Sequence, residues 1–357
     1  MNEIGARWHA LPVEITPDEL GSWCPEIPLP LAVTGGSGFI GSHLVDALLA
    51  GGLRPRLLVR DPARLSERVR SSADVVCGGL EDPGAIREAV GECRTVIHLA
   101  GLVRAENERR FDRANRIGTD NLVRAMQERV PGARLVHLSS LAATGPSVDP
   151  GGKTPEDEPR PVSAYGRSKL GGEAAARGHA GPWVILRPPA VYGPRDIDIL
   201  QFFKLAARGI APLPSGERWV TVAYVSDVVR AILAAAAGFA DRRVLHLGEP
   251  EPRTMAGLVG VLADSGGVRA RVLLIPPAIV RLLGFGGDVL QMFGMRSIAM
   301  TSDKARELLA RHWSACTVTS LAALGLTGFV PMPDGAARTW AWYRDQGWVP
   351  RAKIQRA

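Results

Sequence analysis

The chain has 357 residues, of which 46% are hydrophobic and 22% are charged, and this composition excludes disordered and fibrous proteins and predicts a substantial core. The formal net charge of +7 favours an anionic cofactor or substrate, and because the arginines are scattered and no nucleic-acid motif occurs, we expect no nucleic-acid partner. The four cysteines lie far apart, no apolar run approaches the ~18 residues of a membrane span, and no signal peptide is evident, which predicts a cytoplasmic protein with reduced thiols and no metal site.

Residues 1–29 contain several prolines and tryptophans and show little periodicity. We therefore expect an irregular N-terminal extension. It would pack over the following domain or stay mobile, and a lid or an arm in an oligomer is the alternative.

A short apolar run at residues 31–34 leads into a glycine-rich turn and then a helical pattern. The turn and the helix N-terminus together predict a pyrophosphate site, because glycines let the backbone approach the anion and the helix offers free N–H groups. A glycine turn without a ligand is the alternative for the motif alone. The residues expected to contact a dinucleotide here are Gly35, Ser37, Gly38, Phe39, Ile40 and Gly41.

Residues 55–59 form the second predicted strand, which ends at Arg60 and Asp61. An acid at this strand end binds the ribose 2′-hydroxyl of NAD, whereas an arginine accepts the 2′-phosphate of NADP. Because Arg60 stands at the tip and the acid follows it, we expect NADP(H) to be favoured over NAD(H). The alternative is that Arg60 is an ordinary solvated loop residue.

Apolar strands and amphipathic helices continue to alternate through the first half of the chain. Further strands are predicted at residues 74–77, 96–100, 135–138 and 184–187, and helices at residues 111–129 and 164–176. This alternation is typical of an α/β fold with a doubly wound parallel sheet of the Rossmann type.

The pattern changes after Tyr192 to shorter helices with many Pro and Gly. We expect residues 30–190 to form the NAD(P)-binding domain, residues 219–250 to return to it in part, and residues 191–348 to form mainly a smaller substrate-binding lobe. The lobe is rich in apolar residues between 272 and 293, which favours a hydrophobic ketone or alcohol as substrate. A packed core or a dimer surface is an equal alternative, and weak membrane contact by residues 281–293 is a third.

Tyr165 and Lys169 lie four residues apart on the helix predicted at residues 164–176, so their side chains share one face. A nearby ammonium favours the phenolate and is expected to lower the tyrosine pKa from its usual value near 10. Ser140 follows a strand end, where its hydroxyl could hold a carbonyl oxygen beside the phenol. For an isolated Tyr-x-x-x-Lys pair, a solvated helix face is the alternative.

Taken together and in order, these motifs resemble the extended short-chain dehydrogenase/reductase family, which includes NAD-dependent epimerases and dehydratases. The resemblance is nearest to its ketone reductase and hydroxysteroid dehydrogenase-like branch, and it covers residues 30–348. The residues that carry it are 34–41, 96–101, Asn115, Gly118, Thr119, 139–145, 165–169, 187–194, 222–227 and 340–348.

The resemblance implies a role for each matching residue. Ser140 matches the catalytic Ser/Thr, Tyr165 the general acid/base, and Lys169 the lysine that tunes the tyrosine pKa and binds the cofactor ribose. Asn115 matches an asparagine that is structural or joins a proton relay. Further cofactor contacts are implied for Leu80, Leu99, Ala100, Gly101 and Pro188, and a homodimer through two long helices is implied as well.

Departures from the family pattern narrow the expected reaction. Gly79 stands where the family often has an Asp that holds adenine, and Ala190 stands where sugar-nucleotide enzymes have an Asn. Leu141 and Ala142 replace the acids that follow the catalytic Thr in sugar-nucleotide dehydratases. We therefore expect hydride transfer between a nicotinamide and a ketone or secondary alcohol.

Two other functions remain as alternatives. One is an epimerase or isomerase of a sugar-nucleotide or related substrate that retains and recycles its NAD(P). The other is a cofactor-binding scaffold protein without catalysis, although loss of the tyrosine or lysine would have signalled it and both are present.

Overall fold

The computed structural model describes residues 14–292 and 300–350. At its centre lies a seven-stranded sheet in the order β11-β6-β5-β4-β1-β2-β3, with every neighbouring pair parallel. Its strands are β1 (Leu31–Thr34), β2 (Arg56–Val59), β3 (Asp74–Cys77), β4 (Thr95–His98), β5 (Arg134–Leu138), β6 (Trp183–Arg187) and β11 (Arg243–His246). The order reverses between β1 and β4, which places a ligand crevice at their carboxyl ends. The predicted doubly wound α/β fold is confirmed.

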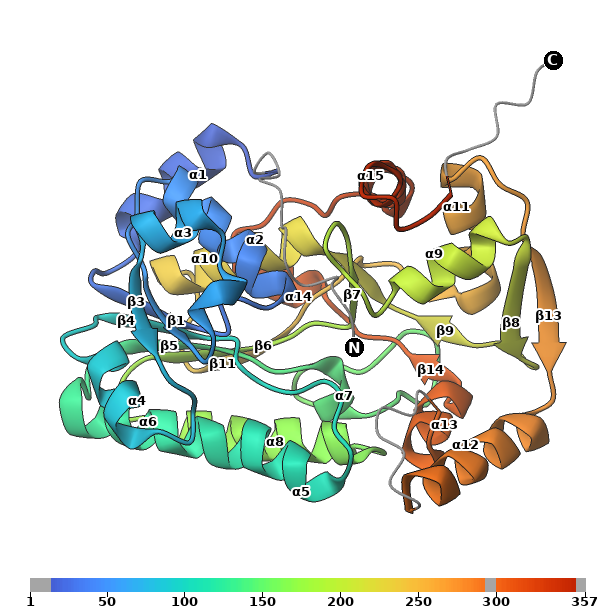
Figure 1. Ribbon diagram of the computed structural model, residues 1–357, viewed down its shortest axis with the longest axis horizontal. Helices are drawn as coiled ribbons and strands as arrows, with labels where there is room; N and C mark the ends of the chain where they lie inside the picture. The colour runs from blue at the N-terminus through green and yellow to red at the C-terminus, as the bar shows by residue number, and fades with distance from the viewer. Residues whose placement is uncertain (1–13, 293–299, 351–357) are drawn as a thin grey trace.

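Helices cover both faces of this sheet (Figure 1). One layer contains α2 (Phe39–Ala50), α3 (Glu67–Ser72) and α10 (Val225–Ala237), and the opposite layer contains α4 (Pro83–Val90), α6 (Gly118–Arg129) and α8 (Ala164–Arg177). Leu44 and Ile232 are buried in the first core, and Ile86 and Leu122 in the second. The strands contribute apolar side chains to both cores, for example Val33 to the first and Ala32 to the second, as buried parallel strands usually do.

The N-terminal segment corrects one expectation. Residues 14–29 are not irregular, because they contain the helix α1 (Pro17–Trp23) and the short 3₁₀ turn η1 (Cys24–Glu26). Thr16 and Glu19 form a reciprocal capping box. The helix that follows has only seven residues, so its periodicity is too short to stand out in the sequence. Residues 1–13 lie outside the described part of the chain.

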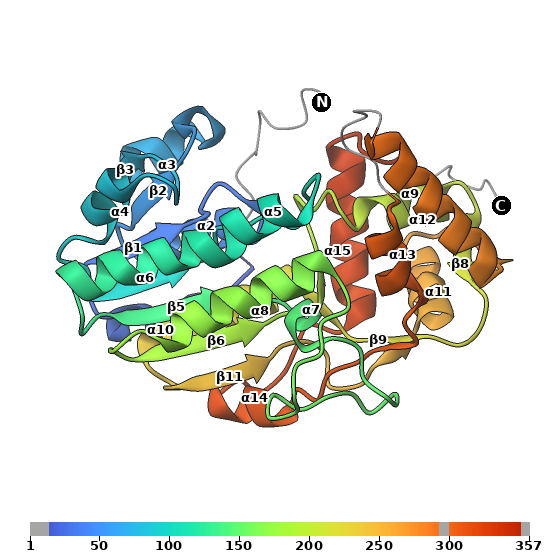
Figure 2. The same ribbon diagram turned by 90° about the horizontal axis from the view of Figure 1, so that it is seen from below.

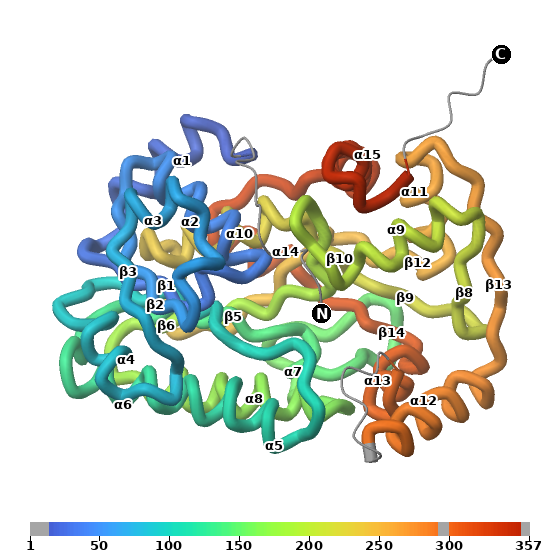
Figure 3. Tube along the Cα trace, viewed as in Figure 1, coloured from blue at the N-terminus to red at the C-terminus, as the bar shows by residue number. Residues whose placement is uncertain are grey.

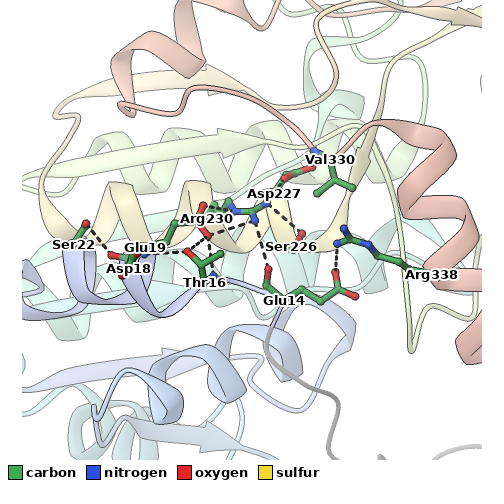
Figure 4. A network of polar contacts seen from close by, with 10 residues as sticks. All are labelled: Glu14, Thr16, Asp18, Glu19, Ser22, Ser226, Asp227, Arg230, Val330 and Arg338. Atoms are coloured by element: carbon green, nitrogen blue, oxygen red, sulfur yellow. Dashed lines mark hydrogen bonds and ion pairs between the residues drawn. The ribbon is translucent and has the colours of Figure 1, made fainter.

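Polar contacts fasten this segment to the body of the protein (Figure 4). Arg230 on α10 donates to the carboxylates of Glu19 at 2.8 Å and Asp227 at 2.6 Å. Asp227 also accepts the Val330 N–H at 2.9 Å, and Arg338 pairs with Glu14 at 3.6 Å. With Trp23 buried in the core, the segment is part of the folded domain.

The predicted helix over residues 111–129 is interrupted. The segment consists of α5 (Glu108–Phe111), a π-helical stretch η3 (Asp112–Ile117) and then α6. Periodicity does not reveal such a bulge, because it depends on tertiary contacts of Asn115 described below. π-Bulges occur frequently at functional sites.

Of residues 219–250, only α10 and β11 join the main layers. The segment at residues 219–225 is divided between two small sheets. Strand β10 (Val222–Tyr224) pairs with β7 (Ala190–Tyr192), and β9 (Trp219–Val220) lies between β12 (Arg253–Thr254) and β14 (His312–Trp313). The break falls at Thr221, whose N–H donates to the Trp313 carbonyl.

The remaining elements gather at one end of the molecule (Figures 1 and 2). They include α9 (Leu200–Ala207), α11 (Met255–Ser265), α12 (Pro277–Met292), α13 (Ser302–Leu309) and α15 (Met332–Asp345). Phe203, Trp340 and Tyr343 form an aromatic core with ring centroids 5.0–5.1 Å apart. The parallel pair β8 (Ile210–Pro214) and β13 (Arg271–Ile275) lies at the outer edge (Figure 3).

The short elements η2 (Pro62–Arg64), α7 (Leu141–Thr144) and α14 (Val318–Ala323) complete the described fold. Within residues 14–292 and 300–350, none of the helices combines the length and apolarity that crossing a bilayer requires.

Candidate active site at the carboxyl ends of the central strands

The glycine turn after β1 is pressed against the end of β4. Gly35 adopts a left-handed φ of 76°, and a Cβ there would lie 2.6 Å from the Ala100 nitrogen. A Cβ at Gly41 would lie 2.1 Å from the Gly35 carbonyl oxygen. Only glycine fits at either position, so the turn brings backbone atoms closer together than any side chain permits.

The start of α2 has the donors that a dinucleotide pyrophosphate needs. Gly38 is the exposed N-cap residue, and no side chain caps the first N–H groups of the helix. Ser37, Phe39 and Ile40 are half-buried around it, and Leu99 and Ala100 lie beside the turn at the end of β4. These residues fit a bound dinucleotide, because uncapped helix amides and a close glycine backbone both favour the phosphates.

At the tip of β2, Arg60 is exposed and makes no ion pair within the described part of the chain. Asp61 points its carboxylate back to the Ala63 N–H at 3.0 Å and caps η2. The acid is therefore engaged in a local turn, while the guanidinium is available to an anion.

The segment after β3 is held by a residue that the sequence reasoning missed. Asn121 on α6 donates to the Leu80 carbonyl at 2.8 Å. The Leu80 side chain packs on Gly118, where an added Cβ would lie 2.9 Å from Leu80 Cδ1. The sequence signal was weak, because a single polar residue on a helix is usually solvated.

Lys169 lies between β5 and the loop after β4. Its Nζ donates to the Leu138 carbonyl at 2.6 Å, and a Cβ at Gly101 would lie 3.7 Å from it. The side chain is buried, and this burial lowers the Lys169 pKa to about 8 although Glu173 opposes the shift. The ammonium is thus retained at neutral pH and lost in mild alkali.

Tyr165 and Ser140 are brought together, as expected from the sequence. The Ser140 side chain lies close enough to the Tyr165 phenol to oppose the rise of its pKa, and as the N-cap of α7 the Ser140 hydroxyl accepts the Ala142 N–H at 3.1 Å. The phenol packs beside Phe111, with ring centroids 5.8 Å apart.

The expected lowering of the tyrosine pKa is wrong for this structure. Desolvation raises the pKa of the Tyr165 phenol to about 12, and the neighbouring Ser140 side chain opposes the shift without overcoming it. The Lys169 ammonium donates to the Leu138 carbonyl. Glu307 and Asp198 raise the pKa further through their negative charges.

Asn115 acts as a clamp in the π-helical stretch. Its Oδ1 accepts the Leu102 N–H at 2.8 Å, and its Nδ2 donates to the Leu102 carbonyl and the Ser168 hydroxyl. The amide thereby ties the loop after β4 to the helix that carries Tyr165 and Lys169. The side-chain amide therefore has partners for both its oxygen and its nitrogen within the protein.

A buried ion pair beneath the site was not anticipated. Arg187 at the end of β6 donates to both oxygens of Glu173, at 2.8 and 2.7 Å, and both side chains are fully buried. Ser139 donates to the same carboxylate at 2.5 Å. The signal was available, because Glu173 follows Lys169 by four residues on the same helix face.

A second buried polar chain runs under the glycine turn. Thr34 Oγ1 contacts His98 Nδ1 at 2.7 Å and also accepts the Ala100 N–H at 3.2 Å. His98 Nε2 contacts Thr119 Oγ1 at 2.9 Å. Burial, reinforced by the Lys169 charge, lowers the His98 pKa to about 3, so the imidazole is neutral at neutral pH.

The segment after β6 joins the same edge of the sheet. The buried Pro188 accepts the Leu141 N–H at 2.8 Å through its carbonyl, which fixes α7 and Ser140 beside it. Ala190 is exposed at the start of β7. The sequence-derived residues from β1, β4, β5, β6 and α8 therefore meet at one end of the sheet, and Arg60 lies at the same end, at the tip of β2 beside β1.

Sequence comparison gives a family match over most of this region. The pattern of the NAD dependent epimerase/dehydratase family matches residues 31–248. A ceramide reductase of Caulobacter vibrioides is 33% identical over 328 residues, which span 90% of this chain and 96% of that relative. A 4-hydroxy-2-methyl-3-oxo-4-farnesyl-3,4-dihydroquinoline-1-oxide ketoreductase of Stigmatella aurantiaca is 27% identical over 270 residues, 72% of this chain and 79% of that protein.

Solved structures with this fold include a double mutant of the dTDP-glucose 4,6-dehydratase DesIV of Streptomyces venezuelae with NAD bound. It is 26% identical, has a TM-score of 0.72, and the match covers 90% of this chain and 99% of that one.

Proposed function

The chain belongs to the NAD dependent epimerase/dehydratase family, and we propose that within it this protein is an NADP(H)-dependent reductase of a ketone on a largely apolar, ceramide-type lipid. Chemistry at a CH–OH or C=O carbon with a nicotinamide cofactor is common to the family and to both reductase relatives. The choice of substrate class is supported by the relative named ceramide reductase and by the apolar lobe.

The observation that carries the proposal is the pairing of Ser140 and Tyr165 at the end of the sheet. A bound nicotinamide would supply the hydride. Ser140 would orient the substrate carbonyl, and Tyr165 would donate the proton to its oxygen. The raised pKa of about 12 keeps the proton on the phenol at neutral pH, so Tyr165 would be in the state that can act as the acid.

The residues that would hold the cofactor are those at the glycine turn, the end of β4 and Lys169. Lys169 keeps positive charge beside this region below its pKa of about 8. Turnover that depends on the ammonium should therefore decline as the pH rises through about 8.

The alternative is an epimerase that keeps its cofactor bound. Leu141 weighs against a sugar-nucleotide dehydratase, since its buried side chain occupies the position where those enzymes carry an acid. Net consumption of NADPH during turnover would exclude a cofactor-recycling epimerase.

Replacing Tyr165 with Phe tests the proposed acid. We expect kcat for NADPH-dependent reduction of a keto-ceramide in detergent micelles to fall about 10²–10⁴-fold, with the NADPH Kd unchanged. Tyr192→Phe is the matched control, because that buried phenol contacts the Met332 carbonyl in the outer lobe. Near-normal turnover by Tyr165→Phe would reject the assignment.

Replacing Arg60 with Asp tests the proposed cofactor preference. We expect the NADPH Kd to rise about 10–100-fold while the NADH Kd changes little, because only NADPH has the 2′-phosphate. Arg64→Asp, at an exposed position in η2, removes the same charge nearby and should alter both affinities slightly. Equal loss of NADPH affinity in both variants would contradict a specific contact.

A further inference from the structure

Helix α12 buries mainly small residues and exposes large apolar ones, which is the reverse of a usual surface helix. Its inner face consists of Val280, Gly284 and Gly287, which are buried. Its outer face presents Leu282, 68% exposed, and Leu283, 56% exposed. An ordinary amphipathic helix buries its large apolar side chains and exposes its small or polar ones. The outward leucines of α12 are therefore mostly in contact with solvent.

The glycines explain how this arrangement is held. A Cβ at Gly284 would lie 2.9 Å from the Ala305 Cβ on α13 and 3.0 Å from the Thr301 carbonyl oxygen. The close approach fastens α12 to α13 through backbone, not through its large side chains. The tight contact with α13 therefore fixes the orientation of α12 and keeps its leucines directed outward.

Exposed leucines also occur on the strand before the helix. Leu273 and Leu274 on β13 are 46% and 65% exposed, and β13 pairs only with β8. Figures 1 and 2 both place α12 at the outer edge of the molecule. We call Leu273, Leu274, Ile279, Leu282, Leu283 and Phe285 the outer apolar patch. Large apolar side chains exposed together at one edge of a molecule mark contact sites.

The charges around the outer apolar patch are positive. Arg269, Arg271 and Arg281 are exposed, and within residues 14–292 and 300–350 none of them forms an ion pair. The one acidic residue of α12, Asp288, accepts the Ser302 N–H at 3.1 Å and so serves the α12–α13 packing. Apolar side chains flanked by arginines match the interface of a bilayer that contains anionic lipids.

A second copy of this chain fits the patch less well. A two-fold contact would bring the same arginines of both copies together without carboxylates to pair with them. The net charge of +7 adds to this repulsion.

The patch is connected to the candidate active site. Asp303 on α13 accepts the N–H of Ala164, the first residue of α8, at 2.9 Å. Tyr165 follows directly, and Glu307 of α13 is close enough to raise the pKa of its phenol. A surface that rests on a bilayer through α12 would therefore present the region of Tyr165 near the lipid.

From these observations we propose that the outer apolar patch docks this protein on the surface of a membrane containing anionic lipids, with α12 lying in the interface plane. The docking itself is independent of catalysis, whereas its use in taking a substrate from the bilayer rests on the proposed function above. Since a lipid ketone is scarcely soluble in water, such docking supplies the substrate where it resides.

Vesicle binding by the full chain tests the proposal. The purified protein is mixed with phosphatidylcholine vesicles with or without phosphatidylglycerol, and the bound fraction is measured by flotation. We expect binding to the anionic vesicles that weakens with added salt, because the arginine contribution is screened. Leu282→Ser/Leu283→Ser/Phe285→Ser should reduce the partition coefficient about tenfold or more.

Two controls keep the result interpretable. Val148→Ser/Val318→Ser removes exposed apolar side chains elsewhere on the surface and should bind vesicles like the parent chain. Arg271→Glu/Arg281→Glu should lose the preference for anionic over neutral vesicles. NADPH binding by each variant verifies that the sheet domain is folded.

Absence of vesicle binding by the parent chain would overturn the proposal. So would a triple variant that binds normally, or one that only converts a dimer into monomers, which would assign the patch to a second copy. Reduction of a short-chain, water-soluble ketone without vesicles is measured in parallel. Its failure would count against the proposed function and leave the docking result standing.

Discussion

Two strands with nearly the same sequence have opposite surroundings in this molecule. Strand β2 reads Arg-Leu-Leu-Val, and Leu57 and Leu58 are 0% and 4% exposed. Strand β13 reads Arg-Val-Leu-Leu-Ile, and Leu273 and Leu274 are largely exposed. β2 lies between two neighbouring strands and two helical layers, whereas β13 has one neighbour. Similar apolar sequences therefore form core in the sheet domain and exposed surface in the outer lobe, the group of elements that contains α9, α11, α12, α13 and α15.

The same contrast holds for the glycines and the titratable groups. In the sheet domain, glycines bring backbone atoms together around a proposed cofactor site, and buried histidines stay neutral. At the base of the outer lobe, the buried Asp196 has its pKa raised to about 7 by desolvation, and its carboxylate accepts the Asp198 and Ile199 N–H groups. Three predictions with paired variants follow from these contrasts.

The largest effect is expected from truncating one leucine of each strand. Leu58→Ala should lower the free energy of unfolding by about 2–5 kcal/mol, because it leaves a cavity between packed layers. Leu274→Ala should change it by less than about 0.5 kcal/mol, because water already contacts most of the side chain. Urea unfolding of both variants measures this difference. Similar losses for the two would refute the contrast between core and contact surface.

A smaller effect on stability, with loss of cofactor binding, is expected at the glycine turn. A Cβ in Gly41→Ala would collide with backbone, so we expect a cost of about 1–3 kcal/mol and failure to bind NADPH in a fluorescence titration. Gly286→Ala on α12 meets no atom within 4 Å, so it should leave NADPH binding unchanged and raise the free energy of unfolding by about 0.5–1 kcal/mol through helix propensity. If Gly41→Ala bound NADPH normally, the turn would not be the cofactor cradle.

The smallest effect is expected from pH. His98 takes up a proton near pH 6.5 when unfolded but only near 3 when folded, so its contribution makes the protein less stable as the pH falls from 6.5. Asp196 acts in the opposite sense, since it keeps its proton to about pH 7 when folded and loses stability as the pH rises from 3.8. Each group contributes at most about 1.4 kcal/mol per pH unit.

The stabilities of His98→Asn and Asp196→Asn at pH 5 and pH 7 separate the two contributions. His98→Asn should weaken the loss of stability in acid, and Asp196→Asn should deepen it. Identical pH profiles for both variants and the parent chain would show that the burial of His98 and Asp196 does not affect the free energy of unfolding.

The sheet could be predicted from the sequence because burial on both faces leaves a continuous apolar run. Residues 74–77 match β3 at both ends, whereas β4 ends at His98 and not at residue 100. The difference arises because the Ala100 N–H turns to the Thr34 hydroxyl, a contact between distant residues that no local pattern encodes.

The candidate site was predictable where the residue type itself carries the chemistry, as for Tyr165, Lys169 and the glycines. Its electrostatics were not, since the pKa of Tyr165 depends on desolvation and on Glu307 from another lobe. The roles of these residues in catalysis, and the domain boundaries, remain predictions.

The outer lobe was the least predictable part. The apolar segment at residues 272–293 was compatible with a substrate pocket, a core, a dimer surface or membrane contact. The direction in which Leu282 faces depends on Gly284 lying against Ala305, a contact made only in the folded chain.

The π-helical stretch at Asp112–Ile117 makes the spacing of this chain intolerant to a one-residue deletion. Removing one residue there would restore ordinary α-helical pitch and rotate everything on one side of the cut by about 100°. Asn115 would then point away from Leu102 and Ser168, and the loop after β4 would lose its latch to α8. We therefore expect homologous proteins to show no insertions or deletions within this π-helical stretch.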